Sequence, residues 1–229
     1  MRTMNLESRA RLHAALGEPT RLAIVDDLRV SDRSPKEIAD RLGIATNLLA
    51  HHLDVLEDAG AIDRPKSAGD GRRRYVRLLP RVVEFLGSAE QPPVRDVLFL
   101  CTRNSARSQL AAALWRARTG RSARSAGTRP ADCVSPGAVA AAHRAGASLE
   151  GAVPTALDRI PRGVQVITVC DLVHEELEPA GDWWHWSIPA PSASRRAGAF
   201  DVVAAELNER MSRLGLPESV RKIERKPAQ

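Results

Sequence analysis

The chain has 229 residues, of which 43% are hydrophobic and 27% charged, and its formal net charge is +6. This length suffices for two domains, each with its own core. No apolar run approaches the roughly 20 residues that span a bilayer, and the first residues lack the apolar stretch of a secretory signal, which favours a cytoplasmic protein without membrane contact. Cys101, Cys133 and Cys170 are too scattered for a disulfide framework or a structural zinc site, so we expect reduced thiols.

The predicted domain boundary is a linker over residues 87–93, where helical periodicity stops and Pro92 and Pro93 forbid its continuation. Residues 1–86 are predicted to form a mainly helical domain closed by a hairpin. After the linker, short apolar runs are each followed by a helical stretch. This alternation predicts an α/β domain with a parallel sheet over residues 94–216. The charged residues 217–229 are expected to form a flexible tail.

The first domain contains a predicted helix-turn-helix. Its first helix opens with the cap residue Ser34, has Pro35 at the first helical position and Glu37 at the third, and then repeats apolar residues at helical spacing. A tight turn over 43–45 leads into a second helix over 46–60 that ends at glycine. One face of this helix can enter a major groove and contact base edges and phosphates. The residues on that face are Thr46, Asn47, Ala50 and His51.

A basic hairpin is predicted directly after the second helix. Residues 61–78 suggest two strands around Gly69-Asp70-Gly71, with Arg72, Arg73 and Arg74 at the tip. Three arginines in a row are typical of a solvated turn. Beside a recognition helix, however, they predict a wing whose guanidinium groups contact phosphates or the minor groove.

These residues resemble the arsenic-repressor (ArsR) family of winged-helix regulators. Leu16 to Leu22 follow the family's L-x-x-P-x-R-L pattern, and His52 to Gly60 follow its H-L-x-x-L-x-x-A-G pattern. The resemblance implies a homodimer that binds a palindromic double-stranded DNA operator. Metal-sensing members often carry a Cys-x-Cys pair before the first helix of the motif, whereas residues 28–34 contain no cysteine. Adjacent His51 and His52 point about 100° apart on a helix, so we expect no metal site.

The second domain opens with a strand that runs into a candidate anion-binding loop. A loop between strand and helix directs backbone N–H groups at one point, with the positive end of the helix dipole behind them. Arg107 can grip two oxygens of a tetrahedral oxyanion, and the same surroundings should favour the thiolate of Cys101. Ser108 can donate a hydrogen bond to that thiolate, and Asn104 can brace the loop. The predicted oxyanion-binding residues are Thr102, Arg103, Asn104, Ser105, Ala106 and Arg107.

The full string from Cys101 to Gln109 resembles the active-site loop of low-molecular-weight tyrosine phosphatases, and more closely that of the arsenate reductases that share their fold, where C-T-x-N-S-A-R-S-Q is typical. The resemblance implies a three-layer α/β fold that binds phosphate or arsenate. It also implies that Cys101 is the nucleophile, Arg107 the oxyanion clamp and Cys170 the first resolving cysteine, with Ser108 as a further catalytic residue.

Two departures from the family pattern limit how far the family's activity can be expected of this chain. The family's P-D-P, whose aspartate protonates the leaving group, is replaced by a sequence with Ala190 at the centre. Losing a general acid typically costs about 10²–10⁴ in rate, which disfavours a tyrosine phosphatase. Leu177 stands where thioredoxin-coupled reductases have a further cysteine, seven residues after Cys170. No cofactor is expected, although a small thiol could reduce a Cys101 adduct directly.

The sequence leaves three functions open. The first is a transcriptional regulator whose second domain is a degenerate oxyanion sensor. The second is a bifunctional regulator and arsenate reductase that uses Cys101 with a small-thiol reductant. The third is a phosphatase. Regulation is favoured because the DNA-binding motifs match their family throughout, whereas the enzyme motifs depart from theirs at Ala190 and Leu177.

Overall fold

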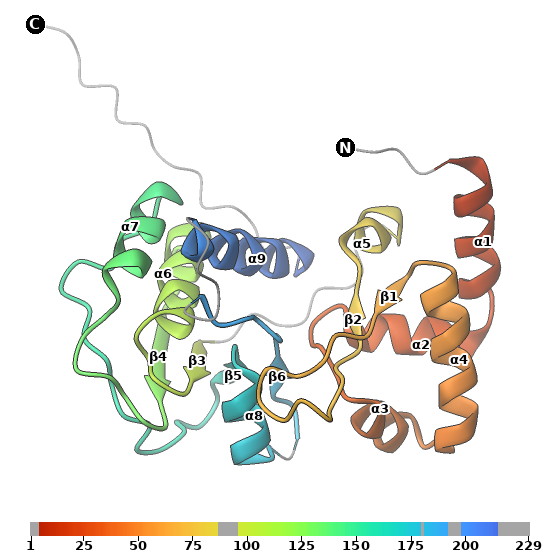
Figure 1. Cartoon of the computed structure of the whole chain (residues 1–229), viewed down its shortest axis with the longest axis horizontal. Helices are drawn as coiled ribbons and strands as arrows, with labels where there is room; N and C mark the ends of the chain where they lie inside the picture. The colour runs from red at the N-terminus through yellow and green to blue at the C-terminus, as the bar shows by residue number, and fades with distance from the viewer. Residues whose placement is uncertain (1–4, 87–95, 180, 192–197, 215–229) are drawn as a thin grey trace, which may run out of the picture.

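The computed structural model describes residues 5–86, 96–179, 181–191 and 198–214. Two modules lie side by side in it, and each has its own hydrophobic core (Figure 1). The predicted linker 87–93 and tail 217–229 fall outside the described residues, so the domain boundaries stay predictions. Within the described ranges, no helix combines the length and the apolar character needed to cross a membrane.

The first module is mainly helical, as predicted. Its elements are, in chain order, α1 (Leu6–Leu16), α2 (Pro19–Leu28), α3 (Pro35–Leu42), α4 (Thr46–Asp58), β1 (Ile62–Asp63), β2 (Arg77–Leu78) and α5 (Pro80–Leu86). Ser34 caps α3 with a capping box, because its side chain accepts from Glu37 N while the Glu37 carboxylate accepts from Ser34 N. Gly43 ends α3 in the left-handed conformation, with φ of 63°. Glycine adopts this conformation without strain, so the tight turn before α4 follows from the sequence.

The predicted hairpin is present, but its regular strands have only two residues each. They pair antiparallel through Ile62 and Leu78, and an isolated bridge joins Lys66 to Arg74. Pro65 lies between these pairings and has no N–H to donate, which interrupts the ladder. We keep the name wing for residues 61–78, which form this hairpin.

The second module is an α/β domain, as predicted. Its elements are β3 (Val97–Cys101), α6 (Arg107–Thr119), β4 (Ala123–Gly127), α7 (Pro136–Arg144), β5 (Gln165–Thr168), α8 (Asp171–Leu177), β6 (Trp184–His185) and α9 (Ala199–Arg213). The sheet has the order β4-β3-β5-β6, and every pair is parallel. The strands end on the same edge, with Cys101 opposite Gly127 and Leu100 opposite Thr168. This edge holds the candidate oxyanion loop.

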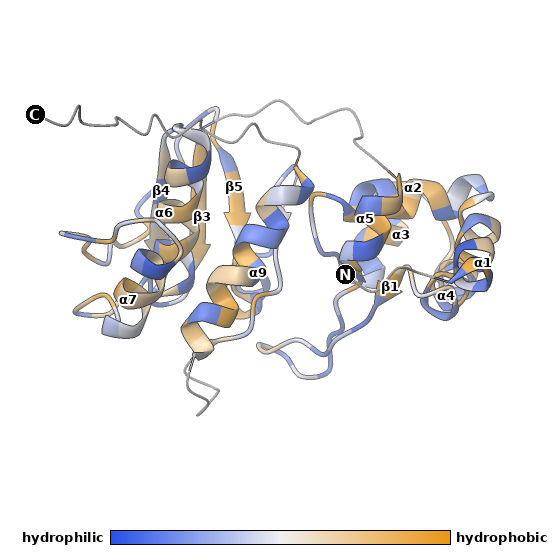
Figure 2. Ribbon diagram, turned by 90° about the horizontal axis from the view of Figure 1, so that it is seen from above, coloured by the Kyte–Doolittle hydropathy of each residue, from blue (hydrophilic) through white to orange (hydrophobic). Residues whose placement is uncertain are grey.

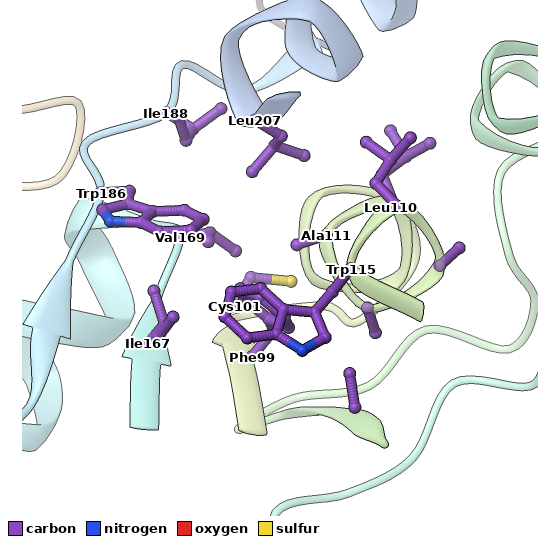
Figure 3. Packing of buried hydrophobic residues seen from close by; sticks show 14 of the residues in the cluster. Phe99, Cys101, Leu110, Ala111, Trp115, Ile167, Val169, Trp186, Ile188 and Leu207 are labelled. Carbon is purple, nitrogen blue, oxygen red and sulfur yellow. The ribbon is translucent and has the colours of Figure 1, made fainter. Parts of the chain in front are cut away.

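The core of the second module fixes the strand that leads into the loop. All five residues of β3 are buried, and β3 and β5 are largely apolar along their length (Figure 2). The ring of Phe99 lies 5.8 Å from the rings of both Trp115 and Trp186. Figure 3 shows Phe99 and Cys101 packed between β5 and α6. Cys101 therefore leaves a strand that has little freedom to move.

Polar contacts bind the two modules to each other. Asp32, just before α3, forms a buried ion pair with Arg210 of α9, with Arg210 Nη2 at 2.9 Å from Asp32 Oδ2. The indole N–H of Trp186 donates to the carbonyl oxygen of Val30 at 2.9 Å. Ser187 N donates to Asp32 Oδ2 at 2.8 Å. The two modules are thus joined directly, by hydrogen bonds and a buried ion pair.

Candidate functional site

Cys101 lies at the last position of β3, where its side chain meets the beginning of α6. The residue is 2% exposed. Its Sγ lies 2.9 Å from Ser108 Oγ and accepts a hydrogen bond from Asn104 N at 3.2 Å. Strand and helix thus place a buried sulfur between a hydroxyl and a backbone N–H group. The predicted pairing of Cys101 with Ser108 is present in the structure.

Asn104 holds the loop closed from within. Its backbone is left-handed, with φ of 47°, and its side chain is fully buried. The amide Nδ2 donates to Ser108 Oγ at 2.7 Å, while Oδ1 accepts from Gln109 Nε2 at 3.0 Å and from Thr155 N at 2.8 Å. Asparagine tolerates this backbone better than most residues. The structure therefore gives Asn104 the bracing contacts that the sequence suggested, and adds Gln109 and Thr155 as partners.

The carbonyl groups of the loop point outward, toward residues 129–135. Thr102 O, Arg103 O and Ser105 O accept from the N–H groups of Arg129, Ala131 and Ser135, at 2.8, 2.9 and 2.8 Å. In a trans peptide the N–H group points opposite to the carbonyl group. The N–H groups that follow these three carbonyls therefore point to the inner side of the loop, as the Asn104 bond to Cys101 Sγ illustrates. Convergent N–H groups of this kind suit an anion.

Gly127 allows the loop to come this close to β4. A Cβ atom at Gly127 would lie 2.7 Å from Thr102 O and 2.9 Å from Asn104 N. Real Cβ atoms do not approach backbone atoms so closely, so only glycine fits here without a shift of the loop. The close approach of the loop to β4 is the physical reason for glycine at this position.

Arg107 begins α6 beside the loop and is half-buried. Its Nη1 donates to Ile188 O at 2.9 Å. Ile188 belongs to residues 186–191, which we call the strap because they run from β6 past the loop and also contact the first module. Ala190 lies on the strap and is half-buried, two residues beyond the carbonyl that Arg107 contacts. Arg103, by contrast, is exposed.

Cys170 lies near the loop, on the residue that caps α8. It is 2% exposed, and its Sγ lies 3.4 Å from Thr102 Oγ1. Cys101 and Cys170 are both free thiols. Leu177, at the end of α8, is half-buried and packs against the core. The structure thus brings both predicted catalytic cysteines to the same loop, while their roles stay predictions.

The predicted DNA-contacting residues all lie on the surface of the first module. Leu49, Leu53 and Leu56 bury one face of α4 in the core. The predicted DNA contacts on α4 and on the wing are all exposed, namely Thr46, Asn47, Ala50, His51, Arg72, Arg73 and Arg74. His52 is buried, with Nδ1 at 3.5 Å from Glu18 Oε2. The described residues contain no group of three or more His, Cys, Asp or Glu side chains arranged for a metal ion.

Sequence reasoning missed a cluster of titratable residues between the modules. His174 and His185 stack at 4.2 Å, and both Nδ1 atoms contact Thr168 Oγ1. His174 Nε2 contacts Glu37 of α3 at 3.2 Å, and His185 Nε2 contacts Asp171 at 3.1 Å. Burial opposes ionisation of Glu37, but hydrogen bonds from His174 and Ser34 lower its pKa to about 2.

Burial lowers the pKa of His174 despite its hydrogen bond to Glu37, and the neighbouring His185 lowers it further. Burial also acts against ionisation of Asp171, yet the hydrogen bond with His185 lowers the pKa of this carboxyl below its usual value. No local sequence signal identifies this cluster, because its members come from both modules and meet only in the folded chain.

Two family models match this chain. One, described as a helix-turn-helix domain, matches residues 16–65. The other, described as low molecular weight phosphotyrosine protein phosphatase, matches residues 96–226, which is more than half of the chain. Among curated proteins, the HTH-type transcriptional repressor SmtB of Mycobacterium tuberculosis is 37% identical over 73 residues, which are 32% of this chain and 52% of the repressor. The chain spans about half the length of the curated relatives that it matches.

Among solved structures, an arsenate reductase from Archaeoglobus fulgidus is 28% identical with a TM-score of 0.43, and the match covers 52% of this chain and 98% of that one. A thioredoxin-dependent arsenate reductase from Corynebacterium glutamicum is 24% identical with a TM-score of 0.43, over 60% of this chain and 68% of that one. The chain thus belongs to the low molecular weight phosphotyrosine protein phosphatase family and carries an ArsR/SmtB-type helix-turn-helix domain ahead of that domain.

Proposed function

We propose that the chain is a cytoplasmic transcriptional regulator that binds a palindromic DNA operator as a homodimer. A tetrahedral oxyanion of the arsenate or phosphate class would bind in the loop Cys101–Arg107 and lower its operator affinity. The choice of ligand is supported by the convergent N–H groups of the loop, by Arg107 and by the arsenate reductase-like loop sequence. One observation carries the regulatory part of the proposal: the strap contacts both the anion loop and the DNA-binding module.

The two contacts of the strap lie within three residues of each other. Ile188 O accepts from Arg107 Nη1, while Ser187 N and the Trp186 indole donate to Asp32 and to Val30 O in the segment just before α3. Trp186, Ser187 and Ile188 are buried. Because these residues are tightly packed, a displacement of the strap should also displace Val30 and Asp32, which lie just before α3 of the helix-turn-helix.

An oxyanion would compete for the donor that now serves the strap. Gripping two oxygens requires two N–H groups on one side of the guanidinium of Arg107. If Nη1 turns toward the anion, Ile188 O loses its hydrogen bond inside a buried environment, which is costly unless the strap moves. Anion binding and strap position are thereby linked, and linkage of this kind is reciprocal between the two sites.

The test is a titration of operator affinity with arsenate and with inorganic phosphate. A fluorescent duplex selected by the wild-type chain from a random-sequence pool serves as the probe, and calorimetry on the same samples reports anion binding. We expect the dissociation constant for DNA to rise at least about fivefold at saturating anion, the low end of typical allosteric coupling. Arg107→Lys keeps the positive charge but removes the guanidinium group that can bind two oxygens at once, so it should abolish this response. Unchanged DNA affinity at saturating anion would refute sensing.

A second function, thiol-dependent arsenate reduction, is favoured by the placement of Cys101 Sγ beside Ser108 Oγ and the inward N–H groups. The thiolate would displace hydroxide from arsenate and form an S–As bond. A small thiol would then attack Cys101 Sγ, arsenic would leave as arsenite with the bonding electron pair, and a second thiol would cleave the mixed disulfide. Two thiols become one disulfide as arsenic(V) becomes arsenic(III), so the electrons balance.

Arsenite formation with thioredoxin and with small thiols, measured in parallel, tests this second function. Turnover that Cys101→Ser abolishes would establish it, whereas no turnover with any thiol would remove it. The same assays on Ala190→Asp ask whether a restored carboxyl group raises activity.

A phosphatase is disfavoured because alanine cannot protonate a leaving oxygen, so we expect aryl phosphate hydrolysis only in the Ala190→Asp variant.

A further inference from the structure

The tip of the wing is hydrogen-bonded to two carboxylates of α8. Glu175 Oε2 accepts from Asp70 N at 2.7 Å, while Oε1 accepts from Ser67 Oγ at 2.6 Å and from the Tyr75 hydroxyl at 3.2 Å. Asp171 Oδ2 accepts from Ala68 N at 2.7 Å. Figure 1 shows the loop of the wing lying against α8, away from the rest of its own module. The second module therefore satisfies the polar groups at the wing tip.

Gly69 lets the wing come into close contact with α8. A Cβ atom at this position would lie 2.5 Å from Glu175 Oε2 and 3.0 Å from Leu172 N. Gly71, only two residues away, has free space around it, since a Cβ atom there would meet nothing within 4 Å. Neither glycine has a positive φ. The chain thus offers two matched positions in one turn, of which only Gly69 is packed against the helix.

The wing has little regular structure of its own to hold this position. Its strands are two residues long, and a two-stranded hairpin in isolation is at best marginally stable. Arg72, Arg73 and Arg74 nevertheless remain exposed while the backbone beside them is bound to α8. The contacts with Glu175 and Asp171 therefore fix the backbone without covering the three arginines.

The same helix begins at the oxyanion loop. Cys170 caps α8, and its Sγ lies 3.4 Å from Thr102 Oγ1, one residue from Cys101. Asp171, the next residue, is one of the two carboxylates that hold the wing. Val169 N, just before the cap, donates to Leu100 O in β3. The wing and the oxyanion loop are thus both attached to one short helix of seven residues.

We infer that Glu175 and Asp171 are positioning residues for DNA binding: through them α8 holds the wing so that its arginines reach the DNA backbone, and through Cys170 it ties the wing to the oxyanion loop. The inference rests on the proposed function for the role of the wing in DNA binding. It adds a specific element through which the state of the loop reaches the DNA-contacting surface.

The main test compares Glu175→Gln with Glu176→Gln, measured without any anion. Both variants remove one negative charge from α8, but Glu176 contacts Thr128 and Arg129 rather than the wing. Charge alone predicts a slightly higher DNA affinity for both variants. The positioning role predicts that Glu175→Gln binds the selected duplex about tenfold more weakly, because the three donors of the wing then face a neutral amide with a single acceptor oxygen in place of a carboxylate. Equal or tighter binding by Glu175→Gln than by Glu176→Gln would overturn the inference.

Gly69→Ala and Gly71→Ala form a second matched pair that leaves the charge unchanged. The first should weaken DNA binding by a similar factor, because its methyl group displaces the wing from α8, while the second should leave binding unchanged. Salt dependence identifies the cause. If the arginines lose phosphate contacts, the slope of log affinity against log salt should fall by about one to three in Glu175→Gln and Gly69→Ala. An unchanged slope would contradict the positioning role.

A mutant cycle separates positioning of the arginines from a general loss of stability. In a background with Arg72, Arg73 and Arg74 replaced by alanine, Glu175→Gln should cost no further DNA affinity. Additive losses would overturn the inference. Amide exchange at Asp70 gives a readout without DNA, and it should accelerate in Glu175→Gln but not in Glu176→Gln. A DNA response to Glu175→Gln combined with no response to anions would leave the positioning role standing and refute sensing.

Discussion

The oxyanion loop and the interface between the modules are both buried and polar, but they are built from different parts of the chain. The side-chain bonds inside the loop come mainly from residues 101–109, with Asn104 bonded to both Ser108 and Gln109. The interface joins residues as far apart as Asp32 and Arg210, which are separated by 178 positions. A local site can form wherever its own sequence is present, whereas the interface requires both modules to be folded and in place.

The two regions should therefore respond differently when a single hydrogen bond or ion pair is removed. The bonds around Cys101 and Asn104 mostly join residues of the same strand, turn and helix, so removing one should act first on the anion site. Each bond of the interface is supported by two modules, so removing one should leave a charge or polar group buried between them. Variants in each region, measured for stability, anion binding and DNA binding, can therefore test whether the two regions are independent.

Breaking the buried ion pair of the interface should have the largest effect. Asp32→Ala leaves Arg210, which is 3% exposed, without its main partner. We expect a loss of about 3–5 kcal/mol in the free energy of unfolding, measured by urea titration with tryptophan fluorescence. Combining Asp32→Ala with Arg210→Met should recover much of this loss. Phosphate binding to the folded protein should survive in both variants, and its disappearance would show that loop and interface are not separate.

A smaller effect is expected from removing the brace inside the loop. Asn104→Gly keeps the left-handed backbone accessible but deletes the side chain that bonds to Ser108, Gln109 and Thr155. We expect a loss of about 2 kcal/mol, since buried partners are left unsatisfied, together with weaker phosphate binding by calorimetry. The control is Glu178→Gly, at the other non-glycine residue with positive φ among those that the structure describes; Glu178 is exposed. If both variants behave alike, the backbone rather than the brace determines the result.

The mildest perturbation is a change of pH, which should act on the interface and not on the loop. The pKa of His174 is lowered in the folded protein, so the unfolded chain takes up the proton first as pH falls through its ordinary value of 6.5. The stabilisation is therefore full above that value and declines below it, with a slope of up to about 1.4 kcal/mol per pH unit. His174→Gln should flatten the decline measured by urea titration.

The exposed His143 provides the matched control for this prediction. His143→Gln should leave the pH profile unchanged above the range where carboxylates titrate. Within that range the stability of the wild-type protein should decline further, because Glu37, with a pKa of about 2 in the folded protein, is protonated earlier in the unfolded chain. A His174→Gln profile identical to that of the wild type would assign the acid sensitivity to other groups.

The sequence predicted those features whose causes are local. The capping box at Ser34, the glycine turn before α4 and the bracing contacts of Asn104 all depend on residues a few positions apart, and the structure confirms them. The mainly helical first module and the parallel sheet of the second are also confirmed. The hairpin was predicted, but its regular strands are shorter than expected because Pro65 interrupts the ladder.

The interface could not be predicted, because nothing near Glu175 in sequence signals its partners. Ser67 and Tyr75 lie 108 and 100 positions away, in another module. An acidic residue on a short helix is typical of a solvated face, and Glu176 beside it is indeed exposed. Trp186 is similar: its burial fits ordinary core packing, and only the structure reveals its bond to Val30 O.

The stacked imidazoles impose a limit on the number of protons between the modules. If each Nε2 donates to its carboxylate, both Nδ1 atoms face the same Thr168 hydroxyl, which has one proton to give. Two neutral rings would compete for that proton, and two charged rings 4.2 Å apart would repel each other. The shared hydroxyl of Thr168 therefore couples the tautomers of the two rings. The contact that His174 makes with Glu37 of the first module then depends on where the ring proton of His185 lies in the second.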